Sequence, residues 1–161
     1  FIAAMLTGAD LASITPSHLV LIGTATALVG FCEEMVSRGI LLVGLRGSLK
    51  SETQVWFYSS LLFGLLHASN AFFGLGAIAL VQVVAAFCVG TGLYLLRRLT
   101  GTLLVPMLVH ACWDFSTLAG HARHASISDL TVALQLGTYL VCLAMVFLVL
   151  RVDGARGSAR E

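Results

Sequence analysis

Six ionisable residues stand out because they interrupt three segments that are otherwise apolar. They are Glu33, Glu34 and Arg38 in FCEEMVSR, His67 in FGLLH, and His110 and Asp114 in HACWD. A glutamate shielded from bulk water can act as a general base toward a water molecule. Imidazoles can orient that water, ligate a divalent metal or donate to an oxyanion. These residue types therefore indicate a site that activates water for a hydrolytic reaction.

The spacing within two of these motifs predicts which side chains pair. Glu34 and Arg38 are four residues apart, in the favourable order with the acid first. We expect Arg38 to neutralise Glu34 and to leave Glu33, which lies about 100° around the helix, free to act on water. His110 and Asp114 are also four apart, so both can face one cavity.

The overall composition places these motifs in a membrane protein. Of the 161 residues, 58% are hydrophobic and 11% are charged, whereas soluble domains carry about 25% charged residues. The net charge of +1 excludes the basic face that nucleic-acid binding needs, and the high hydrophobicity excludes intrinsic disorder. The four cysteines lie in apolar runs without a C-x-x-C pair, so we expect them to pack as small hydrophobic residues.

Five long apolar segments predict an all-α fold, a polytopic transmembrane bundle of about five membrane helices. Their approximate ranges are 16–45, 52–68, 72–96, 102–118 and 127–150. Each is long enough to cross a bilayer at about 1.5 Å per residue. We expect a single membrane-embedded domain over residues 1–152 and a disordered tail over residues 153–161.

The distribution of basic residues predicts the orientation of the bundle. If successive helices reverse direction, seven basic residues fall on one side and one, Arg123, falls on the other. The seven are Arg46, Lys50, Arg97, Arg98, Arg151, Arg156 and Arg160. By the positive-inside rule, the side with the basic loops and the C-terminus is cytoplasmic. We therefore expect an integral protein of a prokaryotic plasma membrane.

The same topology places the six ionisable groups at similar depths. Counted from the cytoplasmic helix ends, they lie about 12–22 Å into the bundle. An unpaired charge there costs about 2.5–3.5 kcal/mol, so we expect the groups to pair in one shared cavity. We predict access to it from the cytoplasmic side, with His67, the deepest residue, as the one that could instead mark an opening on the far side. Polar residues also join membrane helices, at about 0.6 kcal/mol for each contact, but six ionisable groups in one layer exceed that role.

Three motifs in this order are similar to those of a known family. They are E-E-x-x-x-R at Glu33, Glu34 and Arg38, F-x-x-x-H at Phe63 and His67, and H-x-x-x-N/D at His110 and Asp114. Over about residues 30–115 the chain resembles the CAAX prenyl protease and bacteriocin-processing family, also called CPBP or Abi. The resemblance implies a membrane-embedded endopeptidase that cleaves a membrane-associated peptide or protein, with or without a prenyl group.

The resemblance also implies a role for each motif residue. Glu33 would activate the water and His67 would hold it, His110 and Asp114 would form the oxyanion side, and Glu34 and Arg38 would support the site. Eukaryotic-type members carry Asn at the position of Asp114, and a carboxylate donates only when it is protonated. Asp114 would therefore either orient His110 or bind a metal. A divalent metal such as zinc would be held by Glu33, His67 and His110, and a metal-free Glu–His mechanism is the alternative.

Two functions other than proteolysis remain open from the sequence. A non-catalytic membrane protein of the bacteriocin-immunity type would keep the polar layer for stability. A small proton or metal transporter would also use buried Glu and His, although the chain has no repeated half with matching broken helices. Cleavage of a membrane peptide, abolished by Glu33→Gln, distinguishes the protease from both.

Overall fold

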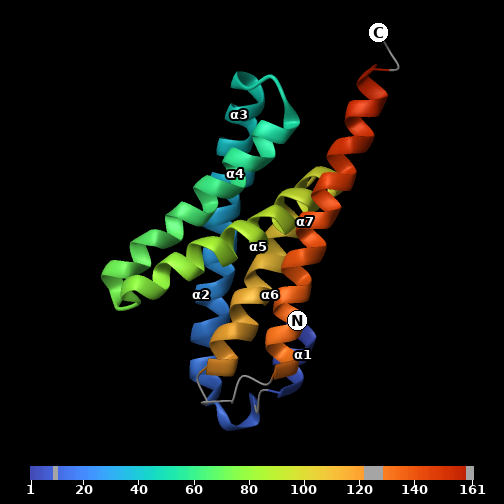
Figure 1. Cartoon of the computed structure of the whole chain (residues 1–161). Helices are drawn as coiled ribbons and strands as arrows, with labels where there is room; N and C mark the ends of the chain where they lie inside the picture. Colours follow the sequence, from blue (N-terminus) through green and yellow to red (C-terminus); the bar gives the residue numbers. More distant parts are fainter. Residues whose placement is uncertain (9–10, 122–128, 159–161) are drawn as a thin grey trace.

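The protein is built from helices (Figure 1). The computed structural model describes residues 1–8, 11–121 and 129–158, and every regular element in these ranges is helical. Three helices are long and apolar enough to cross a membrane, namely Pro16–Ser48, Gly76–Thr100 and Asp129–Val152, and a shorter apolar helix covers Leu104–Ala119. The predicted all-α bundle of membrane helices is therefore confirmed.

The helical elements are joined by short connections. In chain order they are α1 (Ile2–Gly8), η1 (Leu11–Ser13), α2 (Pro16–Glu34), η2 (Met35–Leu41), α3 (Leu42–Ser48), α4 (Glu52–Leu66), η3 (His67–Phe73), η4 (Gly76–Ile78), α5 (Ala79–Thr100), α6 (Leu104–His121) and α7 (Asp129–Ser158). The η elements are short 3-10 helices, except that η2 is a π-helix. The first long helix begins at Pro16, as predicted, because the first helical position needs no N–H donor.

Two boundaries differ from those predicted. α4 ends at Leu66, and the chain then passes through η3 and η4, so that α5 begins at Ala79 rather than near residue 72. Gly74 and Gly76 have φ angles of 106° and 52°, a left-handed backbone that glycine adopts most readily, and they interrupt the helical run. α7 continues to Ser158, through most of the segment expected as a disordered tail, and residues 159–161 lie outside the described residues.

Two glycines allow pairs of helices to approach closely. A Cβ atom added to Gly30 of α2 would lie 2.9 Å from the carbonyl oxygen of Met107 and 3.0 Å from the amide nitrogen of Ala111, both on α6. At Gly64 of α4, an added Cβ would lie 2.8 Å from the carbonyl oxygen of Val83 on α5. Small residues at such crossings let membrane helices pack backbone to backbone. Gly30 therefore brings the end of α2 against the middle of α6.

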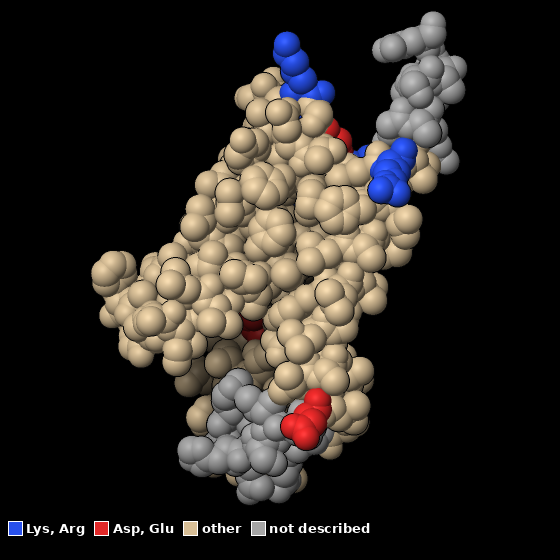
Figure 2. Space-filling model, viewed as in Figure 1, with Lys and Arg blue, Asp and Glu red and all other residues tan. Residues whose placement is uncertain are grey.

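Basic side chains gather at one end of the molecule, which is the upper end in Figure 2. The last turns of α3 and α5 carry Arg46 and Arg98 at this end, and the C-terminal part of α7 carries Arg151. The grouping of these residues agrees with the predicted alternation of helix directions. Arg123, the basic residue expected on the other side, and Arg160 lie outside the described residues.

A polar cluster at the basic end joins three helices. Glu52 Oε1 at the start of α4 accepts hydrogen bonds from Arg46 Nη2 at 2.6 Å and from the Tyr94 hydroxyl at 2.7 Å. Arg98 Nη1 lies 3.0 Å from the same oxygen. The cluster fixes the start of the α4–α5 hairpin, whose other end carries His67.

Replacing Gly30 by Ala should destabilise the protein by about 1–3 kcal/mol, because the new methyl group meets backbone atoms that have no rotamer to change. Thermal unfolding in detergent measures the effect. Gly44→Ala in α3 is the matched control, because nothing lies within 4 Å of its added Cβ. Equal behaviour of the two variants would show that the α2–α6 approach at Gly30 is not required.

Candidate active site

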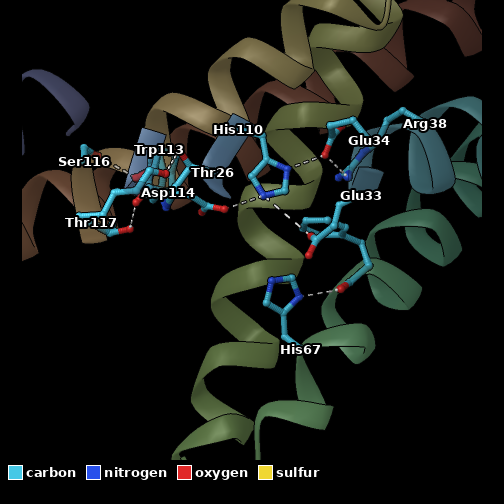
Figure 3. A network of polar contacts seen from close by, with 12 residues as sticks. Thr26, Glu33, Glu34, Arg38, His67, His110, Trp113, Asp114, Ser116 and Thr117 are labelled. Atoms are coloured by element: carbon cyan, nitrogen blue, oxygen red, sulfur yellow. Dashed lines mark hydrogen bonds and ion pairs between the residues drawn. The ribbon is translucent and has the colours of Figure 1, made fainter. Parts of the chain in front are cut away.

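The close approach of α2 and α6 places three carboxylates around one imidazole (Figure 3). His110 Nδ1 lies 2.9 Å from Glu34 Oε1. On the other side of the ring, His110 Nε2 lies 3.5 Å from Asp114 Oδ2 and 3.9 Å from Glu33 Oε2. The His110 side chain is 5% exposed, so most of its polar environment is supplied by these groups.

Arg38 neutralises Glu34 in the way that the spacing predicted. Its Nη1 donates to Glu34 Oε1 at 2.7 Å, and its Nη2 donates to the carbonyl oxygen of Gly90 on α5 at 2.9 Å. The guanidinium carbon also lies 4.1 Å from the ring centre of Phe63. The side chains of Arg38 and Glu34 are 2% and 0% exposed, so this ion pair is buried among three helices.

Glu33 stands apart from that ion pair. Its side chain is 33% exposed, whereas the neighbouring Glu34 is fully enclosed. The Oε2 atoms of Glu33 and Glu34 are both buried and have no hydrogen-bond partner among the described residues. The separation of 3.9 Å between Glu33 Oε2 and His110 Nε2 is too long for a direct hydrogen bond. A polar separation of this kind is one in which a water molecule can take part. The geometry is thus compatible with a carboxylate that is available to a water molecule.

His67 is placed near the other motif residues by Phe63 rather than by a direct contact. His67 Nδ1 lies 3.0 Å from the carbonyl oxygen of Phe63, which can only accept, so Nδ1 carries the hydrogen and Nε2 is left as an acceptor. The Phe63 ring packs edge-on against both imidazoles, with centroid distances of 5.1 Å to His67 and 5.7 Å to His110. Phe63 therefore fixes the position of one imidazole relative to the other.

His67, His110 and Asp114 line one cavity of about 300 Å³, whereas Glu33, Glu34 and Arg38 are not among its lining residues. The structure therefore places only three of the six ionisable groups around this cavity. The cavity wall also includes Gln82 near the start of α5 and Gln135 near the start of α7, whereas the basic residues lie at the opposite ends of these helices. The cavity therefore lies toward the end of the bundle away from the basic residues, while access from the cytoplasmic side stays a prediction. Figure 2 shows a hollow below the middle of the molecule with an acidic side chain at its bottom.

Sequence reasoning missed three polar residues of this cavity because they do not ionise near neutral pH. Gln82 of α5, and Gln135 and Tyr139 of α7, all contribute to the wall. None of the three sequence motifs lies in α7. Gln135 and Tyr139 are four residues apart in a strongly apolar segment, so a search for all polar residues at helical spacing would have found them.

The predicted metal ligands do not form a metal site as they are arranged. Among the described residues, no group of three or more His, Cys, Asp or Glu side chains is positioned to hold a metal ion. His67 Nδ1 faces the Phe63 carbonyl, and His110 Nδ1 faces Glu34, so each imidazole already has one nitrogen engaged. A hydrogen bond at Nδ1 leaves Nε2 of each imidazole available to a metal, so metal binding by Glu33, His67 and His110 stays a prediction.

The π-helix η2 was also not predictable from the spacing of the motifs. It begins at Met35, directly after Glu34, and it contains Arg38. π-helical turns inside longer helices are rare and frequently occur at functional sites. The turn places a local irregularity of the backbone next to the paired glutamates.

Comparison with known proteins agrees with this arrangement. A family model described as "Type II CAAX prenyl endopeptidase Rce1-like" matches residues 15–116, which is more than half of the chain and includes all six ionisable motif residues. Neither a curated protein nor a solved structure matches the chain. The matched segment contains the glutamate pair of α2, His67 at the end of α4, and the His110 motif of α6. The chain belongs to the Rce1-like family of type II CAAX prenyl endopeptidases.

Proposed function

We propose that the protein hydrolyses a peptide bond of a membrane-associated protein or peptide with a water molecule that Glu33 activates. The family describes endopeptidases, which supports a protease. The assignment to Glu33 rests on the different environments of the two glutamates. Glu34 is fully buried and its Oε1 is engaged by Arg38 and His110, whereas the Glu33 side chain is 33% exposed and its Oε2 lies 3.9 Å from His110 Nε2.

The proposed reaction needs only proton transfer and a positioned electrophile. Glu33 takes a proton from the water while the water oxygen attacks the carbonyl carbon of the scissile bond. His110 acts in its doubly protonated form, because Nδ1 donates to Glu34 and Nε2 donates to the carbonyl oxygen as it becomes negative. His67 Nε2 accepts a hydrogen bond from the water. The C–N bond then breaks, and the leaving amine takes the proton from Glu33. Asp114, 3.5 Å from His110 Nε2, orients the imidazole.

The buried ion pair has a supporting role in this proposal. Glu34 accepts from His110 Nδ1 and so fixes the ring with Nε2 directed at Glu33 and Asp114. Arg38 compensates the negative charge of Glu34. In this proposal Glu33 transfers the proton, and Glu34 holds the His110 ring in position.

The cellular setting is proposed on the same basis. The basic end of the bundle faces the cytoplasm of a prokaryotic cell by the positive-inside rule, and the substrate reaches the cavity from the lipid bilayer as a membrane-associated peptide. A prenyl group on the substrate is the form that the family description favours. The test is incubation of the purified protein in lipid nanodiscs with a farnesylated CAAX peptide and with its unprenylated counterpart, followed by mass spectrometry.

Cleavage separates this proposal from the two other functions. A non-catalytic protein of the immunity type or a small proton or metal transporter would leave both peptides intact. Cleavage at one defined bond, lost in Glu33→Gln, would assign the activity to the site. Intact peptides after incubation with a folded wild-type protein would refute the proposed hydrolysis.

Metal removal should leave the cleavage rate within about twofold of the untreated protein, because the proposed proton transfers use Glu33 and the two imidazoles alone. The measurement is the cleavage rate after dialysis against EDTA and 1,10-phenanthroline, with metal content determined by mass spectrometry of the same sample. A loss of activity that added zinc restores would contradict the prediction. It would mean that Glu33, His67 and His110 rearrange into a ligand set when a metal binds.

A further inference from the structure

One wall of the active-site cavity is formed by α7, and the proposed reaction uses no residue of this helix. Gln135 and Tyr139 of this helix line the cavity together with His110 and Asp114 of α6. The two residues are four apart and therefore lie on one face of the helix. Both are polar in a strongly apolar segment, so their positions in the wall are not explained by contact with lipid.

The side chains of Gln135 and Tyr139 form a hydrogen bond that leaves one hydrogen-bond donor and one acceptor available. Gln135 Nε2 donates to the Tyr139 hydroxyl oxygen at 2.7 Å. The hydroxyl hydrogen of Tyr139 and the Oε1 atom of Gln135 have no partner in the ranges 1–8, 11–121 and 129–158. A free O–H donor thus stands next to a free carbonyl acceptor in the cavity wall.

Packing against α6 fixes this pair relative to the proposed catalytic residues. The Tyr139 ring lies against the Trp113 ring, with a centroid distance of 6.3 Å and an interplanar angle of 29°. Trp113 directly precedes Asp114, and both are drawn beside His110 in Figure 3. The tyrosine is therefore positioned by the same helix that positions His110.

A peptide that enters this cavity must replace the hydrogen bonds that its backbone made in water. Each peptide unit carries one N–H donor and one C=O acceptor, and leaving either group unpaired away from water is unfavourable. A free acceptor beside a free donor matches the N–H and C=O of one residue in an extended chain, because these two groups point to the same side of the chain. Gln135 Oε1 can accept from the N–H, and the Tyr139 hydroxyl can donate to the C=O.

We propose that Gln135 and Tyr139 form a binding site for the main chain of the substrate, in which the N–H and C=O of one extended residue near the scissile bond pair with them. This inference rests on the proposed peptidase function. The pair recognises the backbone and not a side chain, so it holds peptides of different sequence in register with Glu33 and His110. Gln135 and Tyr139 are positioning residues in this role.

The test is binding of a farnesylated CAAX peptide to the protein in nanodiscs, measured in the Glu33→Gln background so that the peptide stays intact. Tyr139→Phe and Gln135→Met should each raise Kd about two- to tenfold, the range for one hydrogen bond. Thr138→Val is the matched control, because its hydroxyl donates to the Leu134 carbonyl within α7. The control should leave Kd unchanged.

A second arm separates binding from a structural role. The peptide is N-methylated at one peptide bond at a time, which removes one N–H donor. At one bond, methylation should raise Kd about two- to tenfold with Gln135 present, and it should have less than a twofold effect in Gln135→Met. If Gln135 only supported the fold, the losses of binding free energy from N-methylation and from Gln135→Met would add.

Three results would overturn the inference. The first is that N-methylation and Gln135→Met have additive effects on binding free energy at every peptide bond. The second is equal Kd values for Tyr139→Phe and Thr138→Val, and the third is no detectable binding of any peptide. Coupling in the binding assay without cleavage by the wild-type protein would refute the proposed hydrolysis and support the binding site. Cleavage by the wild-type protein with additive losses would do the reverse.

Discussion

Replacing Glu33 by Gln should lower the rate of peptide cleavage by about two to four orders of magnitude, the range that a general base contributes. The amide has nearly the shape of the carboxylate, but it cannot take a proton from water. Glu33 Oε2 has no hydrogen-bond partner in the part of the chain that the structure describes, so the substitution breaks no internal hydrogen bond of that atom. The loss of activity should therefore occur without loss of the fold.

The measurement is the initial rate of product formation in nanodiscs, with thermal unfolding and gel filtration of the same samples. Glu52→Gln supplies a matched change outside the cavity, because Glu52 lies in the polar cluster at the basic end. It should retain its cleavage rate per folded molecule, whatever its effect on stability. Near-wild-type turnover in Glu33→Gln would remove Glu33 from the mechanism, and loss in both variants would point to a general structural defect.

The helical fold and the pairing within one helix could be predicted from the sequence for simple reasons. Long apolar runs leave few structures other than helices, since each backbone group in a bilayer must be hydrogen-bonded within its own segment. The Glu34–Arg38 pair follows from the geometry of residues four apart, and the structure places its atoms 2.7 Å apart. Both properties depend on local spacing, which a single sequence contains.

The contacts between helices could not be predicted in the same way. Counting residues from the helix ends gave similar depths for His67 and His110, but a depth does not determine where around a bundle a side chain lies. His67 bonds to the Phe63 carbonyl of its own helix and joins the site through the cavity. The cavity wall from α7 and the η3–η4 turn depend on how the α4–α5 hairpin packs, which the apolar segments do not specify.

Gly30 is visible in the sequence, but the sequence alone does not show which helix packs against it. Small residues in membrane helices permit close crossings, but they do not identify the partner helix. In the structure Gly30 meets the backbone at Met107 and Ala111. On α2, Glu33 and Glu34 lie about one helical turn after Gly30, and on α6, His110 lies next to Ala111. The contact at Gly30 therefore brings the glutamates close to His110.

Replacing Arg38 by Ala should destabilise the protein by about 3–5 kcal/mol, the cost typical of leaving one partner of a buried ion pair without its counter-charge. The Glu34 side chain is fully buried, so its charge cannot be transferred to solvent by a small movement. The substitution also removes the hydrogen bond to the Gly90 carbonyl and the contact with the Phe63 ring. Thermal unfolding in detergent should show a much lower midpoint for Arg38→Ala than for Glu33→Gln.

A double variant separates the stranded charge from the lost packing. Glu34→Gln added to Arg38→Ala removes the negative charge while an oxygen remains available to His110 Nδ1. If the stranded charge dominates, the double variant should unfold at a clearly higher temperature than Arg38→Ala alone. A double variant no more stable than Arg38→Ala would assign the loss to packing around Phe63 and Gly90. Equal midpoints for Arg38→Ala and Glu33→Gln would contradict the buried pair itself, since one change strands a charge and the other only neutralises a partly exposed one.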